Sequence, residues 1–160
     1  MKRLLLIVPA LLFLSIGFCQ NRVNVNNLAK YGNKYFKEND DRPFNGIVFN
    51  LSKETGNKIL EYKMVNGLKN GLYREWYPDG TPKLRTKYLN ENLNGKWTGW
   101  HENGQKKSER TYKDGKQDGL SIAWYDNGQK SEEYNIISKN GDETSLKNMW
   151  FKNGQRRYEG

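Results

Sequence analysis

Short runs of alternating apolar and polar residues follow one another along most of the chain, and each run ends at a turn signal. Residues 72–77 and 120–125 are two such runs, rich in aromatic and β-branched side chains, as strands usually are. Asn-Gly or Asp-Gly pairs follow them and tolerate the positive φ that a hairpin turn requires. Partner strands are expected at about 83–88 and 106–112. No amphipathic helix with start and stop signals occurs after Gln20. The pattern predicts an all-β chain of consecutive hairpins.

The hairpin pattern recurs at a fixed step along the chain, and only the last step is slightly longer. Its landmarks are the tryptophans and the turn glycines, namely Trp76, Trp100, Trp124 and Trp150, and Gly80, Gly104, Gly128 and Gly154. This spacing predicts an array of about five 24-residue β-hairpin repeats over residues 46–160. Because each unit of such an array contacts only its neighbours, we expect an elongated single-layer antiparallel β-sheet with little core. The four tryptophans are expected to form a structural ladder on the better-buried face of the sheet, and the alternative is a stacking platform for sugars or bases.

Residues 1–19 have the pattern of a secretory signal peptide, which would be helical. A positively charged start and an apolar run at 4–13 precede small residues, so that cleavage is expected after Gly17 or Cys19. Lipid anchoring through Cys19 is the less favoured alternative, because Phe18 stands where lipoprotein signals have a small residue. We therefore expect an exported protein that is periplasmic, cell-surface or secreted. Residues 20–45 would then lead into the first repeat and contain a short hairpin.

The composition argues against most enzyme chemistries. The 160 residues include 27 Lys and Arg and 18 Asp and Glu, but one Cys and one His. That leaves no disulfide framework, no Cys/His zinc site and few ways to pair a nucleophile with a base. Glu75, Glu102 and Glu109 are the carboxylates that could act in glycoside hydrolysis, but an open sheet does not supply the partly dry cleft they would need. We predict a non-enzymatic protein without catalytic residues, cofactor or metal site.

Candidate binding residues are one variable aromatic residue and a row of basic side chains. Trp97 takes a position that Tyr73 and Ser121 occupy in the neighbouring units, and variation between units favours a binding role. The basic residues follow the turn glycines and, together with Trp97, give a candidate binding face of Trp97, Lys106, Lys107, Lys130 and Arg156. Interleaved glutamates leave open the alternative of an ordinary solvated face.

The single histidine is predicted to be structural. His101 takes the position that Tyr77, Tyr125 and Phe151 occupy in the other units. We therefore expect it to replace an aromatic side chain of the repeat and not to act as a base.

The motif of a tryptophan followed shortly by a turn of the form Asn-Gly-Gln resembles the MORN repeat in its bacterial variant. Residues 97–105 (WTGWHENGQ) and 123–129 (AWYDNGQ) carry the likeness, and residues 28–46 look like the segment that opens such arrays. The resemblance implies a MORN-like hairpin fold and an association with scaffolding and with protein or membrane contact. Many bacterial chains of this kind are labelled antitoxin components of toxin–antitoxin systems, so the resemblance also implies an antitoxin-like role.

These observations predict an exported protein-interaction scaffold or an antitoxin- or immunity-like binder. Its partner would be a toxin-like protein, a surface protein or another copy of the same chain. The alternative is a cell-envelope module that binds glycan or anionic lipid through its aromatic and basic residues. We do not expect nucleic acid to be the partner of an exported chain.

Overall fold

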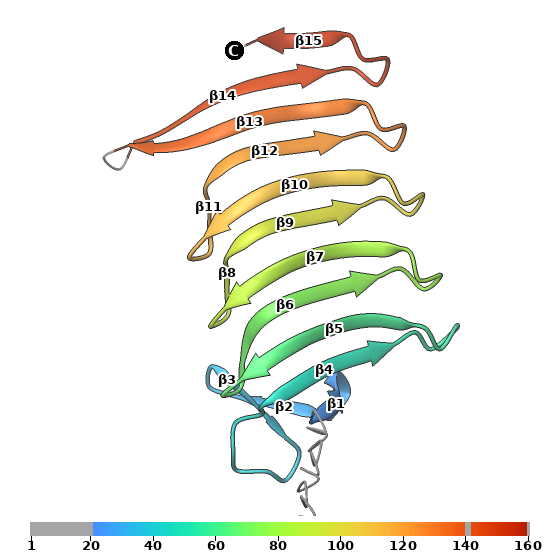
Figure 1. The fold of residues 1–160 in the computed structure, drawn as a ribbon, viewed down its shortest axis with the longest axis vertical. Coiled ribbons are helices and arrows are strands. Elements are labelled where there is room, and N and C mark those ends of the chain that lie inside the picture. Colours follow the sequence, from blue (N-terminus) through green and yellow to red (C-terminus); the bar gives the residue numbers. More distant parts are fainter. Residues whose placement is uncertain (1–20, 140–141, 160) are drawn as a thin grey trace, which may run out of the picture.

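The computed structural model describes residues 21–139 and 142–159, which form one long twisted sheet with a small two-stranded sheet at its N-terminal end (Figure 1). The predicted signal peptide lies outside the described residues. The large sheet contains β1 (Arg22–Asn24), β4 (Gly46–Leu51), β5 (Lys58–Val65), β6 (Leu68–Trp76), β7 (Pro82–Leu89), β8 (Asn92–Leu93), β9 (Gly95–Trp100), β10 (Lys106–Lys113), β11 (Lys116–Gln117), β12 (Gly119–Trp124), β13 (Lys130–Lys139), β14 (Asp142–Trp150) and β15 (Arg156–Glu159). The small sheet pairs β2 (Leu28–Tyr31) with β3 (Lys34–Lys37), and a short 3-10 helix, η1 (Val25–Asn27), precedes it.

From β4 to β15 the long strands pair antiparallel with their neighbours in sequence order. The prediction of an elongated sheet of hairpins is therefore confirmed. The exception to the antiparallel order is β1, which the sequence pattern does not predict. It pairs in parallel with β4, with Val23 opposite Val48, and so covers the edge of the first hairpin.

The hairpin turns that the repeated glycines predict are present and share one geometry. In each turn the first amide donates to the last carbonyl, as Tyr77 N does to Thr81 O at 2.8 Å, and the glycine amide donates back to the first carbonyl. The four turn glycines have φ between +80° and +94°, where a β-carbon is strained. The ladder shifts register beside each turn, so the extra residue forms a β-bulge.

The hairpin turns are stacked along one side of the sheet (Figure 1), and side chains connect each turn to the next. The Asn103 amide donates to the carbonyl of Asp126 at 2.6 Å, and the Asn127 amide donates to the carbonyl of Lys152 at 2.9 Å. The oxygen of each of these amides accepts a bond within its own turn. One asparagine thus closes its own turn and links it to the next.

The hydrophobic core lies at the N-terminal end of the array. Its buried members are Val23, Phe44, Val48, Tyr62 and Met64. Leu28 of β2 and Tyr35 of β3 pack against this cluster, so the small sheet covers the beginning of one face. Backbone bonds fix it there, since Tyr35 N donates to Gly67 O at 3.0 Å and Phe44 N donates to Tyr35 O at 2.9 Å.

The two faces of the large sheet differ in composition. The tryptophan face carries Trp76, Trp100, Trp124 and Trp150, and the tyrosine face carries Tyr62, Tyr73, Tyr88, Tyr112, Tyr134 and Trp97. The expectation that the tryptophan face is the better buried is wrong. Its four tryptophans are half-buried, whereas Val48, Tyr62, Met64, Thr86, Ser108 and Ser121 on the tyrosine face are all buried. The reason is that small side chains there lie beneath larger neighbours, and the small sheet covers one end.

Replacing Gly67 by alanine is expected to destabilise the protein far more than the same change at Gly115. Both glycines take the second place of an equivalent tight turn, with φ of +73° and +83°. A β-carbon at Gly67 would lie 2.8 Å from the backbone oxygen of Tyr35, whereas at Gly115 its nearest neighbour, Asn92 Oδ1, lies at 3.4 Å. Gly115→Ala should lower the free energy of unfolding by about 1–2 kcal/mol, because alanine is strained in a left-handed backbone. Gly67→Ala should lose the same amount and, in addition, the stability that comes from the packing of β3 against this turn. Urea denaturation of both variants measures the difference, and equal losses would contradict the proposed packing of β3.

Candidate binding faces

On the tryptophan face, cationic side chains lie over the indole rings. The Lys58 ammonium is 5.3 Å from the ring centre of Trp76, Lys106 is 5.9 Å from that of Trp124, and Lys130 is 5.7 Å from that of Trp150. In each case the lysine begins the second strand of one hairpin and the tryptophan ends the first strand of the next. The contact therefore joins neighbouring hairpins, and each is worth about 0.5–1 kcal/mol at an exposed site.

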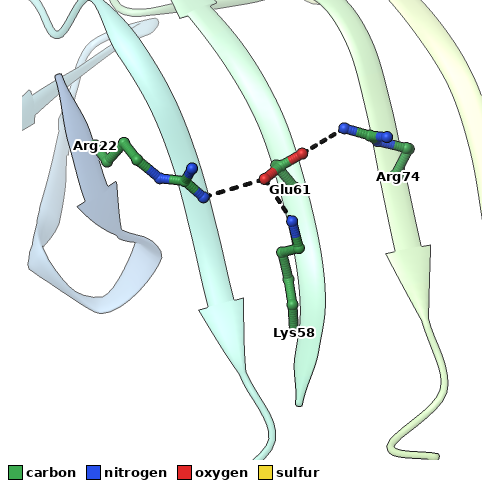
Figure 2. Close-up of polar contacts among 4 residues, drawn as sticks. All are labelled: Arg22, Lys58, Glu61 and Arg74. Carbon is green, nitrogen blue, oxygen red and sulfur yellow. Dashed lines mark hydrogen bonds and ion pairs between the residues drawn. The ribbon is translucent and has the colours of Figure 1, made fainter. Parts of the chain in front are cut away.

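Each of these lysines also pairs with a glutamate further along its own strand. Lys58 Nζ lies 2.8 Å from Glu61, Lys106 Nζ lies 2.9 Å from Glu109, and Lys130 pairs with Glu133. Glu61 has the richest environment: Figure 2 shows Arg22 of β1, Lys58 of β5 and Arg74 of β6 converging on its carboxylate. In each hairpin, the glutamate carboxylate holds its lysine where the ammonium contacts the tryptophan ring.

Glu61 and Glu109 are held in the charged form by their cationic neighbours. Burial raises the pKa of Glu61, but the neighbouring Lys58 and Arg74 lower it by more than burial raises it. The pKa of Glu61 therefore stands below its ordinary value. Burial likewise raises the pKa of Glu109, and Lys96 and Lys106 together bring it below the ordinary value. A carboxyl group with a lowered pKa is a poor general acid, so these glutamates are suited to structural ion pairs.

At the turn side, the predicted structural role of His101 agrees with its contacts. The Tyr77 hydroxyl donates to the carbonyl of Trp100 at 2.9 Å, and the Tyr125 hydroxyl donates to the carbonyl of Trp150 at 3.0 Å. His101 Nε2 lies 3.0 Å from the carbonyl of Trp124. A carbonyl only accepts, so Nε2 carries the proton of this bond. The imidazole thus replaces the tyrosine hydroxyl of the neighbouring units.

On the tyrosine face, Trp97, Arg110 and Tyr134 lie in one cross-strand row. Trp97 pairs with Arg110, whose guanidinium lies 5.3 Å from the indole centre. The indole also lies over Gly99, where a β-carbon would come within 2.7 Å of it. Ser121, the next position of this row, pairs with Tyr134. The Nε of Arg110 is buried and has no hydrogen-bond partner among the described residues.

The structure divides the candidate binding face of the sequence analysis between the two sides of the sheet. Trp97 lies on the tyrosine face, whereas Lys106 and Lys130 lie over tryptophans on the other. Lys107 is exposed at the bulge between Lys106 and Ser108, and Arg156 donates to Asn148 Oδ1 at 3.2 Å. These five residues therefore do not form one surface.

Two residues that the sequence analysis passed over stand out in the structure. Arg110 lies against Trp97, and Arg85 takes the place of a glutamate of the tryptophan face. The signal for Arg85 is in the sequence, because the equivalent positions of the preceding and following units hold Glu61 and Glu109. A comparison of the charge at equivalent positions of the units therefore identifies Arg85 from the sequence.

The geometry offers no catalytic pair among the carboxylates considered. Glu75 accepts a bond from the Tyr73 hydroxyl at 2.6 Å on the tyrosine face, Glu109 lies on the tryptophan face, and Glu102 is exposed in a turn. Within residues 21–139 and 142–159 there is no group of three or more His, Cys, Asp or Glu side chains that could hold a metal ion. In the same part of the chain, no helix has the length and apolar content needed to cross a membrane.

Comparison with known families finds two matches to the MORN repeat variant, at residues 69–90 and 93–114. Each match covers one hairpin, the first formed by β6 and β7 and the second by β9 and β10. MORN repeats are a non-catalytic module, generally associated with binding to proteins or membranes. No curated protein and no solved structure matches the chain.

Acid is expected to destabilise the fold through Glu61. Since its pKa is lower in the folded than in the unfolded state, where it is near 4.5, the folded protein binds fewer protons and loses stability as the pH falls below that value. Glu61→Gln should cost about 1.5–3 kcal/mol at neutral pH, because three cations lose their shared anion, and should flatten the acid limb. Glu102→Gln, in an exposed turn, should change neither the stability at neutral pH nor the loss of stability in acid. Thermal unfolding followed from about pH 3 to about pH 7, across the titration of the carboxylates, tests this, and an acid limb unchanged in Glu61→Gln would contradict it.

Proposed function

We propose that the chain is an exported, non-catalytic scaffold that binds a protein partner through the open part of its tyrosine face. The observation that carries the proposal is that this face is covered at one end and bare beyond it. The small sheet packs over the end that contains Tyr62 and Met64. From Tyr88 onward, no other segment of the described chain packs over this face. A partner would continue the layer that the protein's own hairpin begins.

The residue types on the bare part support a protein partner. Trp, Tyr and Arg are the residues that contribute most to binding energy at protein interfaces, and here Trp97, Arg110 and Tyr134 lie in one row. The rings have little freedom to lose on binding, since Trp97 is held between Gly99 and Arg110. Among the described residues no carboxylate pairs with Arg110, so its guanidinium can bind a carboxylate of a partner.

The class of partner follows from the resemblance and from export. A toxin-like effector, a surface protein or a second copy of this chain would each suit an immunity-like binder. The alternative, adhesion to envelope glycan or anionic lipid through basic residues, is favoured less, because Lys106 and Lys130 are engaged with glutamates and tryptophans.

Export predicts a processed N-terminus in the native protein. The mature chain should begin at Phe18 or Gln20, or at a lipid-modified Cys19 if the anchor is present. Mass spectrometry of the protein isolated from its own cells distinguishes these three. A native chain that still begins at Met1 would contradict export and would leave the binding proposal to stand or fall separately.

Replacing Trp97 by serine should abolish capture of the protein partner. The substitution is mild for the fold, because the next unit carries Ser121 at the same position. Immobilised protein is exposed to native envelope extract at low salt and again at about 1 M salt, where the Debye length falls to about 3 Å. We expect one protein to be retained at both salt concentrations by the wild type and lost by Trp97→Ser and Arg110→Ala.

A matched control is Tyr31→Ser, which removes an exposed aromatic side chain of the small sheet, away from the bare part of the tyrosine face. It should retain the partner. Retention of polysaccharide or lipid alone, released by salt, would favour the alternative function. Equal capture by wild type and Trp97→Ser would show that this face is not the binding surface.

A further inference from the structure

The regular pattern of the tryptophan face fails at one junction, between β7 and β9. At the two positions where the other units place the capping lysine and its glutamate, this unit has Pro82 and Arg85. Within the described part of the chain, no cation lies over the Trp100 ring, and Arg85 has no hydrogen bond or ion pair. Trp100 is thus the member of its row that lacks a lysine cap.

Arg85 puts a positive charge where the neighbouring units have the negative charge of Glu61 and Glu109. Positions directly opposite one another run from Glu61 through Arg74, Arg85 and Thr98 to Glu109. Arg74 and Arg85 therefore face each other, and like charges directly opposite are unfavourable. Arg74 turns its guanidinium to Glu61 and to the Trp76 ring. No carboxylate among the described residues neutralises Arg85.

A hollow of about 450 Å³ lies at the same place. Its lining includes Arg85, Lys87, Lys96, Lys106, Glu109 and the uncapped Trp100. Four cations against one carboxylate leave the hollow positively charged. Glu109 is already shared by Lys96 and Lys106, each at 2.9 Å. An aromatic surface and unneutralised cations thus meet in one concave site, of a size that suits small ligands.

We propose that this hollow binds a sugar acid, with the ring of the sugar on Trp100 and its carboxylate on Arg85. The inference goes beyond the proposed protein-binding function, because it concerns the opposite face, and it assigns a defined site to the class of ligand that the alternative function considers. The ligand carboxylate would stand where Glu61, Glu109 and Glu133 stand in other units and would restore the alternation of charge. An arginine guanidinium can bind a carboxylate through two parallel hydrogen bonds.

The uncapped indole favours a sugar ring over a bare anion. A simple anion would use Arg85 and leave Trp100 unused, whereas the apolar face of a sugar ring packs on a flat aromatic surface. Lys87 is exposed and lines the same hollow, so its ammonium can donate to ring hydroxyls. The source could be a free sugar acid or an acidic polysaccharide, which share this chemistry.

The test is titration of the full protein with galacturonate and a short oligogalacturonate, followed by the indole signals in NMR spectra. We expect the Trp100 signal to move, with the oligomer binding more tightly if the natural source is a polymer and equally if it is a free sugar acid. Neutral galactose and inorganic phosphate should each bind at least tenfold more weakly. Arg85→Glu should weaken galacturonate binding by more than tenfold, and Lys116→Glu, an equal charge change at an exposed position outside the hollow, should not.

The double variant Pro82→Lys, Arg85→Glu separates loss of the site from loss of the fold. It restores the lysine and glutamate of the other units, so its thermal stability should equal or exceed that of the wild type while galacturonate binding is lost. A wild type that does not bind galacturonate would overturn the proposal. So would equal binding of phosphate, or binding that survives in the double variant. None of these outcomes bears on capture of a protein by the tyrosine face.

Discussion

A lysine that lies over a tryptophan of the next hairpin and is held there by a glutamate of its own strand is the contact on which the tryptophan face depends. Beyond the core at its N-terminal end the sheet has water on both sides, so neighbouring strands must stabilise one another through their side chains. The lysine stem covers apolar indole surface while its ammonium stays at the solvent. An isolated surface ion pair contributes little. Here one cation serves a carboxylate and an aromatic ring at once, and the arrangement recurs along the array.

The two faces meet the same constraint in different ways. On the tyrosine face, aromatic rings pack on one another, as Tyr62 and Tyr73 do with ring centres 5.3 Å apart. Small residues such as Thr86 and Ser108 leave room for their larger neighbours. Burial raises the pKa of the Tyr62 hydroxyl to about 12, which reflects how dry this end of the face is. The tryptophan face engages its charged groups with one another, whereas the tyrosine face leaves rings available to a partner.

The hairpins are well predicted from the sequence, because turn chemistry and alternation are local signals. Glycine at the αL position and the fixed step between tryptophans locate both ends of each hairpin. Relative burial was predicted wrongly, because the size of a side chain says less than what lies above it. Flexible cations lie over Trp76, Trp124 and Trp150, and no cation of the described chain lies over Trp100. The parallel strand β1 is not predicted either, since it is three residues long and its pairing of Val23 with Val48 is a long-range contact. The contacts of the candidate sites lie between these extremes. Lys106 and Trp124 belong to different hairpins and meet only because β10 and β12 pair in a particular register. The sequence of one repeat unit therefore does not predict their contact. Lys58 and Trp76 have the same separation along the chain, however, and the contact becomes visible when units are compared.

The junction between β7 and β9 departs from the array in a second, independent way. Where Asn103 and Asn127 each donate to the following turn, the equivalent residue is Asp79. Its carboxylate closes its own turn by accepting from Thr81 N at 2.8 Å, but a carboxylate cannot donate to a carbonyl of the next turn. The bond from the Tyr77 hydroxyl to Trp100 O remains at this turn. Both the lysine cap and the asparagine link are therefore missing at this junction, so fewer side-chain contacts join its two hairpins, and the hollow at Trp100 lies beside it.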